Sequence, residues 1–431
     1  MRKLFIILIC LMAGLNPALA SDEALGWWGG TISYRGDNLD VRIYITRDRD
    51  GDLQGRLDMP ELVYANETVP IFEDQEVGLF TVDYPFGLGE IPYSAEGYDR
   101  MVGTRISIES ALTRIPAPPY RKQDVEFESV TGTVHGTLFV PSGSGPFPAV
   151  VIAAGANNAS REHWSYASWA DYYARLGLAA FVYDRTEDDY VLDDGTVVNL
   201  EVQAHEFADA VRYVQARNAI SRTHVGVAGG SRGAWLAMYA AAEVEDVAFA
   251  IFRSASPLTP GEQTIVEVKA KVYDATSDWD LVADAEAYMR LYFYVAQTGH
   301  GWAALEEEVG RVENGPLHGI VDEPRTQVDL TWWSRNLDFQ PRPMLSHITA
   351  PVLGMWGEAD LISPPDVNAP LMESFLPGGE DQLTTITYAR ADHRLELPLG
   401  ETLDGAFQWF AKAPVQENDI EPWLQSIGIL R

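Results

Sequence analysis

The sequence predicts an α/β fold with a mainly parallel, doubly wound sheet, preceded by a small all-β domain. At 431 residues the chain is too long for one hydrophobic core, which stops growing at about 250–300 residues. Residues 21–115 have the alternation and turns of β-hairpins, whereas residues 125–414 alternate between strand and helix patterns. A proline-rich linker at residues 116–124 separates the two parts, and residues 415–431 are expected to form a C-terminal tail.

The first twenty residues have the pattern of a cleavable secretory signal peptide. A basic start precedes an apolar run at residues 4–12, and Ala18 and Ala20 supply the small side chains that the peptidase requires. Cleavage after Ala20 would begin the mature chain at Ser21 and would place the protein in the periplasm or outside the cell. Because the lone cysteine, Cys10, lies in this segment, the mature chain is expected to have no thiol and no disulfide.

The chain is strongly acidic, with 63 Asp and Glu residues against 31 Lys and Arg residues and a net charge of −32. This charge repels phosphate backbones and anionic headgroups, so the sequence disfavours nucleic-acid binding and binding to a membrane surface. Beyond the leader, no segment reaches the about 18 uninterrupted apolar residues of a spanning helix, so no stable membrane insertion is expected. The expected partner is a small-molecule substrate, and the oligomeric state stays open.

Short alternating segments and turn residues predict the N-terminal β-rich domain. Residues 41–45 alternate in the manner of a half-buried strand, and a turn rich in Asp and Gly follows at residues 49–52. Repetition of this pattern predicts a β-sandwich or a barrel-like domain of about 90 residues. No histidine or cysteine occurs between residues 27 and 115, so we expect no catalytic group of residues there.

Continuous apolar runs of strand length alternate with helical patterns after the linker, which predicts a buried, mainly parallel sheet. Between residues 257 and 336 the alternation stops, and a long, aromatic, mostly helical segment follows. Such an insertion predicts a lid over the carboxyl edge of the sheet. The expected strands are 125–129, 134–140, 149–153, 179–183, 225–228, 247–251, 352–356 and 384–388, and the expected helices are 166–176, 204–216, 233–242 and 403–412.

The segment Gly229–Gly230–Ser231–Arg232–Gly233 is the strongest indication of chemistry in the chain. It fits the pattern G-x-S-x-G between an apolar strand and an alanine-rich helix, which is the context of a nucleophile elbow. The glycines allow a turn so tight that side chains beside the serine would clash. Ser231 is therefore the candidate nucleophile, and the alternative is an ordinary glycine-rich helix start with Ser231 as its cap.

A serine hydroxyl needs a base, and the base needs an orienting carboxylate. His393 follows the strand expected at residues 384–388, and Asp360 follows the strand expected at 352–356, so both lie where such a sheet carries its active site. His393 is the candidate base and Asp360 the candidate acid, with Glu358 as a competitor on the same loop. The other histidines lack metal-ligand spacing, so the sequence predicts neither a metal site nor a cofactor.

Acyl transfer also needs hydrogen-bond donors for the developing oxyanion. The backbone N–H of Arg232, directly after the nucleophile, is the first candidate. The second is expected in the loop after the strand at residues 149–153, and Ala156 is the candidate there, with an ordinary glycine turn as the alternative. The Arg232 side chain is a candidate contact for an acidic acyl group or, alternatively, a salt-bridged surface residue.

From about residue 121 to 412 the chain resembles the α/β-hydrolase superfamily. It is most similar to bacterial serine esterases of the dienelactone-hydrolase and prolyl-oligopeptidase-like branch, in which a β-rich domain often precedes the catalytic one. The resemblance implies hydrolysis of carboxylic esters by Ser231, His393 and Asp360. The matching segments are GTLFVP at 136–141, GPFPAVV at 145–151, YDR at 183–185, the elbow at 229–233, ITAPVL at 348–353 and GEAD at 357–360.

The chain departs from this family in three places. It has Ala154–Gly155 where the family usually has His-Gly, and Gly230 where the family usually has a histidine before the nucleophile. An acidic run at residues 186–189 replaces the usual glycines and serine. Because no triad member is lost, the first hypothesis is an exported serine esterase. Thioester cleavage, amide cleavage and acyl transfer are alternatives within the same chemistry, and a catalytically retired scaffold that acts as a binding protein is the alternative from another class.

Overall fold

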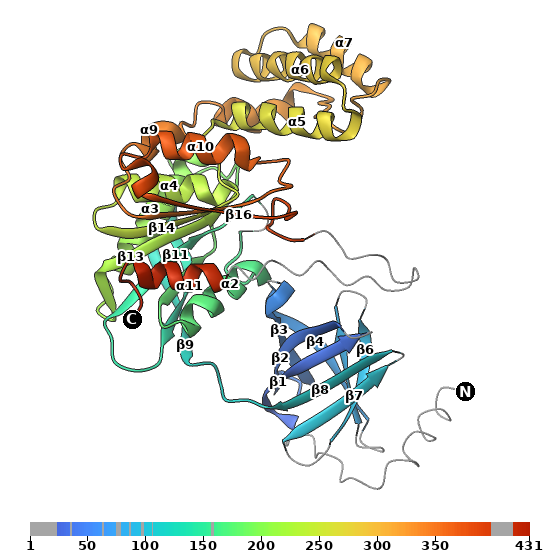
Figure 1. Cartoon of the computed structure of the whole chain (residues 1–431), viewed down its shortest axis with the longest axis vertical. Coiled ribbons are helices and arrows are strands. Elements are labelled where there is room, and N and C mark those ends of the chain that lie inside the picture. The colour runs from blue at the N-terminus through green and yellow to red at the C-terminus, as the bar shows by residue number, and fades with distance from the viewer. Residues whose placement is uncertain are drawn as a thin grey trace. The chain divides into compact units, whose positions relative to one another are not determined.

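The computed structural model describes residues 24–34, 37–62, 64–74, 79–85, 88–95, 99–105, 107–156, 159–397 and 417–431. The chain forms two compact units, one made mainly of the residues up to Pro119 and one that begins at Tyr120 (Figure 1). The predicted signal peptide and the helix expected at residues 403–412 lie outside the described residues, so both stay predictions.

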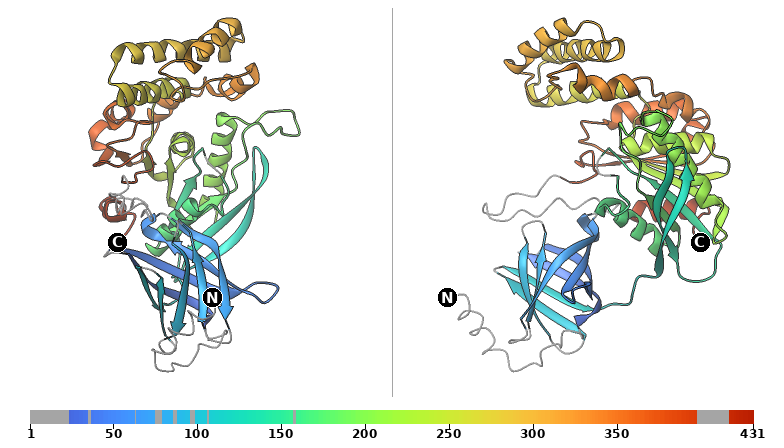
Figure 2. Two further views of the ribbon diagram at one scale, coloured as in Figure 1. Left: turned by 90° about the vertical axis from the view of Figure 1, so that its right-hand side faces the viewer. Right: turned by 180° about the vertical axis from the view of Figure 1, so that it is seen from behind.

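The N-terminal unit is a closed, eight-stranded antiparallel barrel in which each strand pairs with its neighbour in the sequence and β8 pairs with β1 (Figure 2). Closure removes the exposed edges that an open sheet of this kind would present. The prediction of a small all-β domain is therefore confirmed, and the domain is a barrel. Its strands are β1 (Gly26–Tyr34), β2 (Asp37–Arg47), β3 (Leu53–Met59), β4 (Tyr64–Asp74), β5 (Leu79–Tyr84), β6 (Gly89–Ala95), β7 (Arg100–Arg105) and β8 (Ile108–Arg114).

Side chains fill the interior of the barrel. Alternate residues of each strand point inward, so that Trp28 and Ile43 are fully buried in one apolar cluster. The polar groups inside are paired: the Tyr84 and Tyr93 hydroxyls lie 2.7 Å apart, and the Tyr93 hydroxyl donates to Ser110 Oγ at 2.7 Å. Burial raises the pKa of Tyr93 to about 12, so the phenol stays neutral.

The second unit contains an eight-stranded sheet in the order β16-β15-β14-β13-β11-β12-β10-β9 (Figure 1). β10 is antiparallel to β9 and β12, and the other neighbours are parallel. This sheet confirms the expected fold class. The strands are β9 (Tyr120–Ser129), β10 (Gly132–Pro141), β11 (Phe147–Ala153), β12 (Ala179–Tyr183), β13 (Ile220–Gly230), β14 (Val247–Arg253), β15 (Val352–Gly357) and β16 (Leu383–Tyr388).

The linker expected at residues 116–124 is shorter in the structure. β9 begins at Tyr120, because its pairing with β10 continues from Ser129 opposite Gly132 to Tyr120 opposite Pro141. The charged residues between them are compatible with a strand at the edge of the sheet. The residues expected to form a C-terminal tail contain the helix α11 (Glu417–Ser426), whose Ile420, Trp423 and Leu424 are buried at helical spacing.

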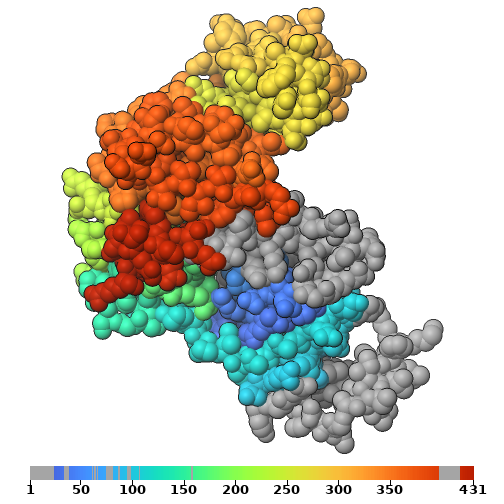
Figure 3. Space-filling view, viewed as in Figure 1, coloured from blue at the N-terminus to red at the C-terminus, as the bar shows by residue number. Residues whose placement is uncertain are grey.

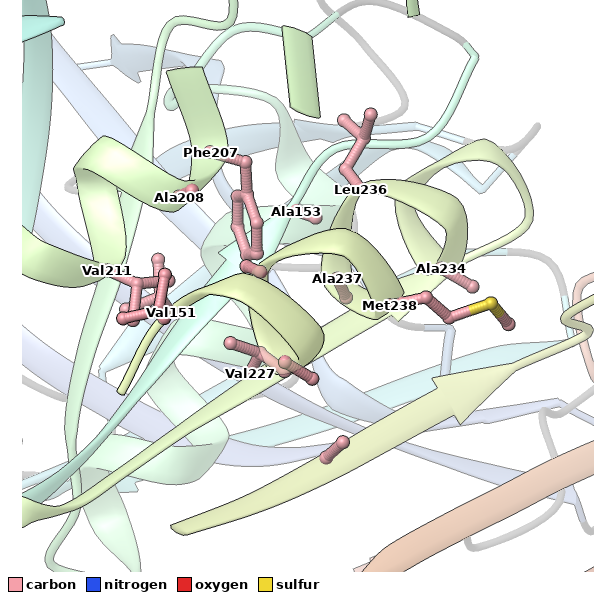
Figure 4. Packing of buried hydrophobic residues seen from close by; sticks show 14 of the residues in the cluster. Val151, Ala153, Phe207, Ala208, Val211, Val227, Ala234, Leu236, Ala237 and Met238 are labelled. Atoms are coloured by element: carbon pink, nitrogen blue, oxygen red, sulfur yellow. The ribbon is translucent and has the colours of Figure 1, made fainter. Parts of the chain in front are cut away.

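Helices cover both faces of this sheet. The α3 (Leu200–Gln215) and α4 (Arg232–Glu243) helices contribute Phe207, Val211 and Leu236 to one apolar cluster with Val151 and Val227 of the strands (Figure 4). On the opposite face lie α11 and α2 (Trp164–Arg175), and the Trp423 ring of α11 packs edge-on against Phe249 of β14 at 6.2 Å (Figure 1). With both faces covered, the central strands carry continuous buried apolar runs, as the sequence predicted.

The segment between β14 and β15 forms the helical insertion, a packed layer that is yellow to orange in Figure 3. Its first helix begins with a capping box between Thr259 and Glu262 and has Pro260 at its first position. Its residues form an apolar cluster of their own around Tyr288 and Phe293. The helices are α5 (Pro260–Thr276), α6 (Trp279–Thr298), α7 (Trp302–Glu313) and α8 (Thr331–Asn336), followed by α9 (Pro341–Leu345) and, after β15, α10 (Pro365–Phe375).

Candidate active site

Ser231 stands at the turn between β13 and α4, at the carboxyl end of the strand. Its φ of 53° and ψ of −126° lie in a region that non-glycine residues rarely adopt, at a cost of about 1–3 kcal/mol. The turn leaves no room for a side chain two residues before or two residues after Ser231, since a Cβ at Gly233 would lie 2.5 Å from the Ala153 carbonyl oxygen and one at Gly229 would collide with the Gly233 carbonyl. The Ser231 side chain makes no capping hydrogen bond, so it is not an ordinary helix cap.

His393 and Asp360 are brought together from the loops that follow β16 and β15. The Nδ1 atom of His393 lies 2.9 Å from Oδ2 and 3.0 Å from Oδ1 of Asp360. The carboxylate is buried, and its Oδ1 accepts from the backbone N–H groups of Ile362 and Ser363, both at 2.8 Å. These bonds fix the carboxylate before any substrate arrives, and a carboxylate at Nδ1 favours the tautomer whose Nε2 is free to accept a proton.

The neighbouring carboxylates serve other purposes. Glu358 is exposed and accepts from the backbone N–H of Arg390 at 3.0 Å. Asp392 accepts from the backbone N–H groups of Arg394 and Glu396, both at 2.9 Å, and so shapes the loop that carries His393. Of the two candidates for the orienting acid, Asp360 contacts the histidine ring.

The backbones of Ser231 and His393 are tied to two consecutive residues at the end of β14. The Ser231 N–H donates to the Arg253 carbonyl at 3.0 Å, and the Ser254 hydroxyl donates to the His393 carbonyl at 2.7 Å. Ser254 is itself buried with a φ of 45°. The structure records no hydrogen bond between the Ser231 hydroxyl and the His393 ring, a contact that often tightens only when substrate binds.

The candidate oxyanion donors lie at two backbone positions. Arg232 is the first residue of α4, where N–H groups have no partner within the helix and point away from its start. Ala156 is exposed and is followed by two residues outside the described part of the chain. Its neighbour Gly155 is already bonded, because its N–H donates to the Tyr166 hydroxyl at 2.9 Å and its carbonyl accepts from Arg185 at 3.3 Å.

The Arg232 side chain is held by two neighbours. Its guanidinium pairs with Asp188 at 2.6 Å and lies 5.0 Å from the ring centroid of Trp332 in α8. Gln203 also donates to Asp188, at 2.9 Å, which fixes the carboxylate. The structure therefore agrees with the salt-bridged alternative for Arg232 and gives a role to part of the acidic run at residues 186–189.

Most aromatic side chains of the insertion do not face the candidate site. Tyr288, Tyr292 and Phe293 are buried in the insertion's own cluster, and Trp279 is 67% exposed. Trp332 is different, because it packs against the core of the α/β unit and against Arg232 beside the nucleophile. At the other end of the insertion, the Gln263 amide donates to the carbonyl of Ile362, next to the loop that carries Asp360.

Two contributors to the site were missed in the sequence. Ser254 holds the His393 loop, and its place directly after a buried strand at the carboxyl edge of the sheet was the available signal. Tyr166, in the first turn of α2, contacts the loop after β11 through its hydroxyl, and no sequence pattern predicted that contact. Among the residues that the structure describes, no group of three His, Cys, Asp or Glu side chains could hold a metal ion, and no helix is both long and apolar enough to span a membrane.

Comparison with solved structures finds esterases and α/β hydrolases, as the resemblance in the sequence predicted. An α/β hydrolase from Penicillium sp. is 17% identical with a TM-score of 0.44 and covers 71% of this chain and 98% of that one. An esterase from Pyrobaculum calidifontis is 18% identical with a TM-score of 0.41, over 63% and 77% of the two chains. Acetyl xylan esterase 1 from Thermoanaerobacterium is 14% identical with a TM-score of 0.39, over 68% and 82%.

Among curated proteins, mouse acyl-coenzyme A thioesterase 3 is 27% identical over 161 residues. The match takes in 37% of this chain and 34% of the mouse protein, so the chain spans about a third of that relative. No protein-family model matches the chain.

Proposed function

We propose that the protein is a serine hydrolase that cleaves carboxylic esters through an acyl-enzyme on Ser231. The proposal depends above all on one observation: a buried Asp360 carboxylate holds His393 at Nδ1, on loops tied to the strained turn that presents Ser231. A partly exposed, uncapped serine and an imidazole oriented by a carboxylate are the groups that nucleophilic acyl transfer needs.

In the proposed mechanism, Ser231 Oγ attacks the acyl carbon while His393 Nε2 accepts the hydroxyl proton. Asp360 stays ionised and stabilises the imidazolium that forms. His393 then gives the proton to the leaving alkoxide, and a water activated by the same imidazole releases the acid. The Arg232 N–H, at the positive end of α4, is a donor to the tetrahedral oxyanion.

The leaving group is an open part of the proposal. The partial match to an acyl-coenzyme A thioesterase favours thioesters as a second substrate class, since the same triad cleaves both. A panel of chromogenic esters and thioesters with graded acyl chains separates the two by their kcat/KM values. A retired scaffold predicts no hydrolysis of the whole panel.

The test of the nucleophile is Ser231→Ala with Ser221→Ala as its control. Ser221 is a partly exposed serine whose hydroxyl lies 2.9 Å from His224 Nδ1, so it reproduces a serine–histidine contact without the elbow. We expect a fluorophosphonate probe to label the wild type and Ser221→Ala, and Ser231→Ala to lose both labelling and ester turnover while it unfolds at the wild-type temperature. Labelling of Ser231→Ala at the wild-type rate would show that the nucleophile lies elsewhere.

Export is a second part of the proposal, and it depends on the sequence of the leader. Mass spectrometry of protein recovered from the periplasm or the medium is expected to find Ser21 at the N-terminus. An intact Met1 on protein from that compartment would contradict cleavage after Ala20.

A further inference from the structure

The end of β14 lies between the strands that lead to the proposed nucleophile and to its acid. On one side β14 pairs with β13, which ends at the Ser231 turn, and on the other with β15, which precedes Asp360. Its last residue, Arg253, accepts from the Ser231 N–H at 3.0 Å, and the next residue, Ser254, donates its N–H to the Met355 carbonyl of β15 at 2.7 Å. Two consecutive residues therefore connect these strands at the edge where the site begins.

The Ser254 side chain adds a third connection, to the loop that carries His393. Its hydroxyl donates to the His393 carbonyl at 2.7 Å, and Ser254 is only 2% exposed. The ring of the same histidine is held at Nδ1 by Asp360 at 2.9 Å. His393 is thus held at two points, its ring by a carboxylate and its backbone by a hydroxyl. The hydroxyl comes from the segment that also holds the backbone of Ser231.

The backbone of Ser254 is strained. Its φ of 45° lies in the left-handed region, which residues with a Cβ avoid and glycine adopts readily. Glycine would therefore suit the backbone at this position better than serine does. A strained residue beside a candidate active site points to a function for its side chain, and the side chain here is the hydroxyl that bonds the His393 loop.

We propose that Ser254 is a positioning residue that sets the place of the His393 ring relative to Ser231. Because Arg253 and Ser254 are consecutive, the backbones of the nucleophile and of the base are tied to residues whose Cα atoms are about 3.8 Å apart. This short connection limits how far the His393 loop can move away from the turn that presents Ser231. Ser254 acts through the histidine backbone and takes no part in bond making, and the inference rests on the proposed serine hydrolase function.

The first test is Ser254→Ala, with Ser256→Ala as the matched control. Ser256 is a second buried serine on the same segment, but its hydroxyl accepts from the Leu258 N–H, at 3.1 Å. Because a small misplacement of a reacting group is costly, we expect kcat of Ser254→Ala to fall by about 10- to 100-fold with KM nearly unchanged, and Ser256→Ala to keep wild-type kinetics. Fluorophosphonate labelling should slow by the same factor as kcat, since both reactions need His393 to accept the Ser231 proton.

A second test separates positioning from a purely structural role by comparing Ser254→Gly with Ser254→Ala. Both variants lack the hydroxyl, but alanine keeps the strained φ and glycine relieves it, so Ser254→Gly should unfold at a higher temperature than Ser254→Ala. If Ser254 positions His393, this gain in stability does not restore activity, and kcat of Ser254→Gly is no higher than that of Ser254→Ala. If Ser254 only stabilises the fold, activity follows stability and the glycine variant is the more active of the two.

The outcomes distinguish this inference from the function on which it rests. Wild-type kcat in Ser254→Ala together with an inactive Ser231→Ala would overturn the role of Ser254 and leave the serine hydrolase intact. Recovery of wild-type turnover in Ser254→Gly, or a loss in Ser254→Ala that lies in KM alone, would overturn it as well. A Ser231→Ala variant that keeps its turnover would overturn both proposals.

Discussion

Replacing Asp360 by asparagine tests the orienting acid without changing the size of the side chain. In the protein, Oδ1 accepts from two backbone N–H groups and both carboxylate oxygens face His393 Nδ1. The backbone N–H groups of Ile362 and Ser363 can only donate, so the amide oxygen of the Asp360→Asn side chain is expected to accept both of those hydrogen bonds. The NH₂ group of the same amide then faces His393 Nδ1. An NH₂ that donates to Nδ1 moves the ring proton to Nε2, where it blocks acceptance of the serine proton.

The expected loss follows from that tautomer. In a comparable triad the same change lowers kcat by about 10⁴-fold, and we expect a loss of this size for Asp360→Asn. Glu358→Gln is the matched control, because Glu358 lies on the same loop but is exposed and accepts one backbone hydrogen bond, from Arg390. The hydrogen bond to Glu358 contributes about 1 kcal/mol or less to the free energy of unfolding. We therefore expect the kcat of Glu358→Gln to stay within a few-fold of the wild-type value.

The assay is steady-state hydrolysis of a chromogenic ester at neutral pH, with thermal unfolding of each variant as the check on folding. Equal losses in the two variants would mean that the carboxylates of this loop share the role. A larger loss in Glu358→Gln would refute the assignment of Asp360 and the tautomer argument with it. Unchanged activity in both would show that His393 needs no orienting acid.

Two further predictions concern the insertion and a buried carboxylate. Trp332→Ala is expected to shift the ratio of kcat/KM between short and long esters because Trp332 packs beside the nucleophile, whereas the exposed Trp279→Ala should not change it; a uniform loss across the series would reduce Trp332 to packing. Burial raises the pKa of Glu206 although Thr131 and Thr186 donate to it, so the folded state holds this proton more tightly than the unfolded state. The protonated Glu206 therefore stabilises the fold below the ordinary glutamate pKa of about 4.3, and this stabilisation is lost as pH rises through the raised pKa. The free energy of unfolding of Glu206→Gln, measured in urea, should accordingly depend less on pH than that of the wild type. A difference between the two proteins that does not vary with pH would contradict this assignment.

The elements that carry the proposed triad were predictable because local patterns set them. A glycine-flanked serine between an apolar strand and an alanine-rich helix has few other ways to fold. The strand before Asp360 is a continuous apolar run, and the strand before His393 is rich in β-branched residues. The choice of Asp360 over Glu358 came from the position of the acid in the resembling family. The structure places Asp360 against His393, with Glu358 on a backbone N–H of the next loop.

Contacts between distant segments were beyond the reach of local patterns. The hydrogen bond from the Gly155 N–H to the Tyr166 hydroxyl depends on how α2 packs next to the loop after β11. The spacing of the two residues along the chain does not predict it. The start of β9 at Tyr120 depends on its pairing with Pro141 across the hairpin, which the local sequence around the preceding prolines does not encode. The aromatic residues of the insertion suggested a pocket wall, but most of them fill its own core, because burial of such rings is indistinguishable from pocket lining in sequence.

The three departures from the resembling family meet at one place in the structure. Gly155, which follows the missing histidine, lies against the carbonyl of Gly230, where the family has another histidine. The Arg185 guanidinium donates to the Gly155 carbonyl, and Asp188 of the acidic run pairs with Arg232 beside the nucleophile. Because the neighbour of Ala154 lies against Gly230, changes at Ala154 and Gly230 are expected to be energetically coupled, so restoring histidine at Ala154 alone should not recover the family's arrangement. In the same loop the Gly155 N–H donates to the Tyr166 hydroxyl, so this backbone donor is already bonded to a side chain of the protein.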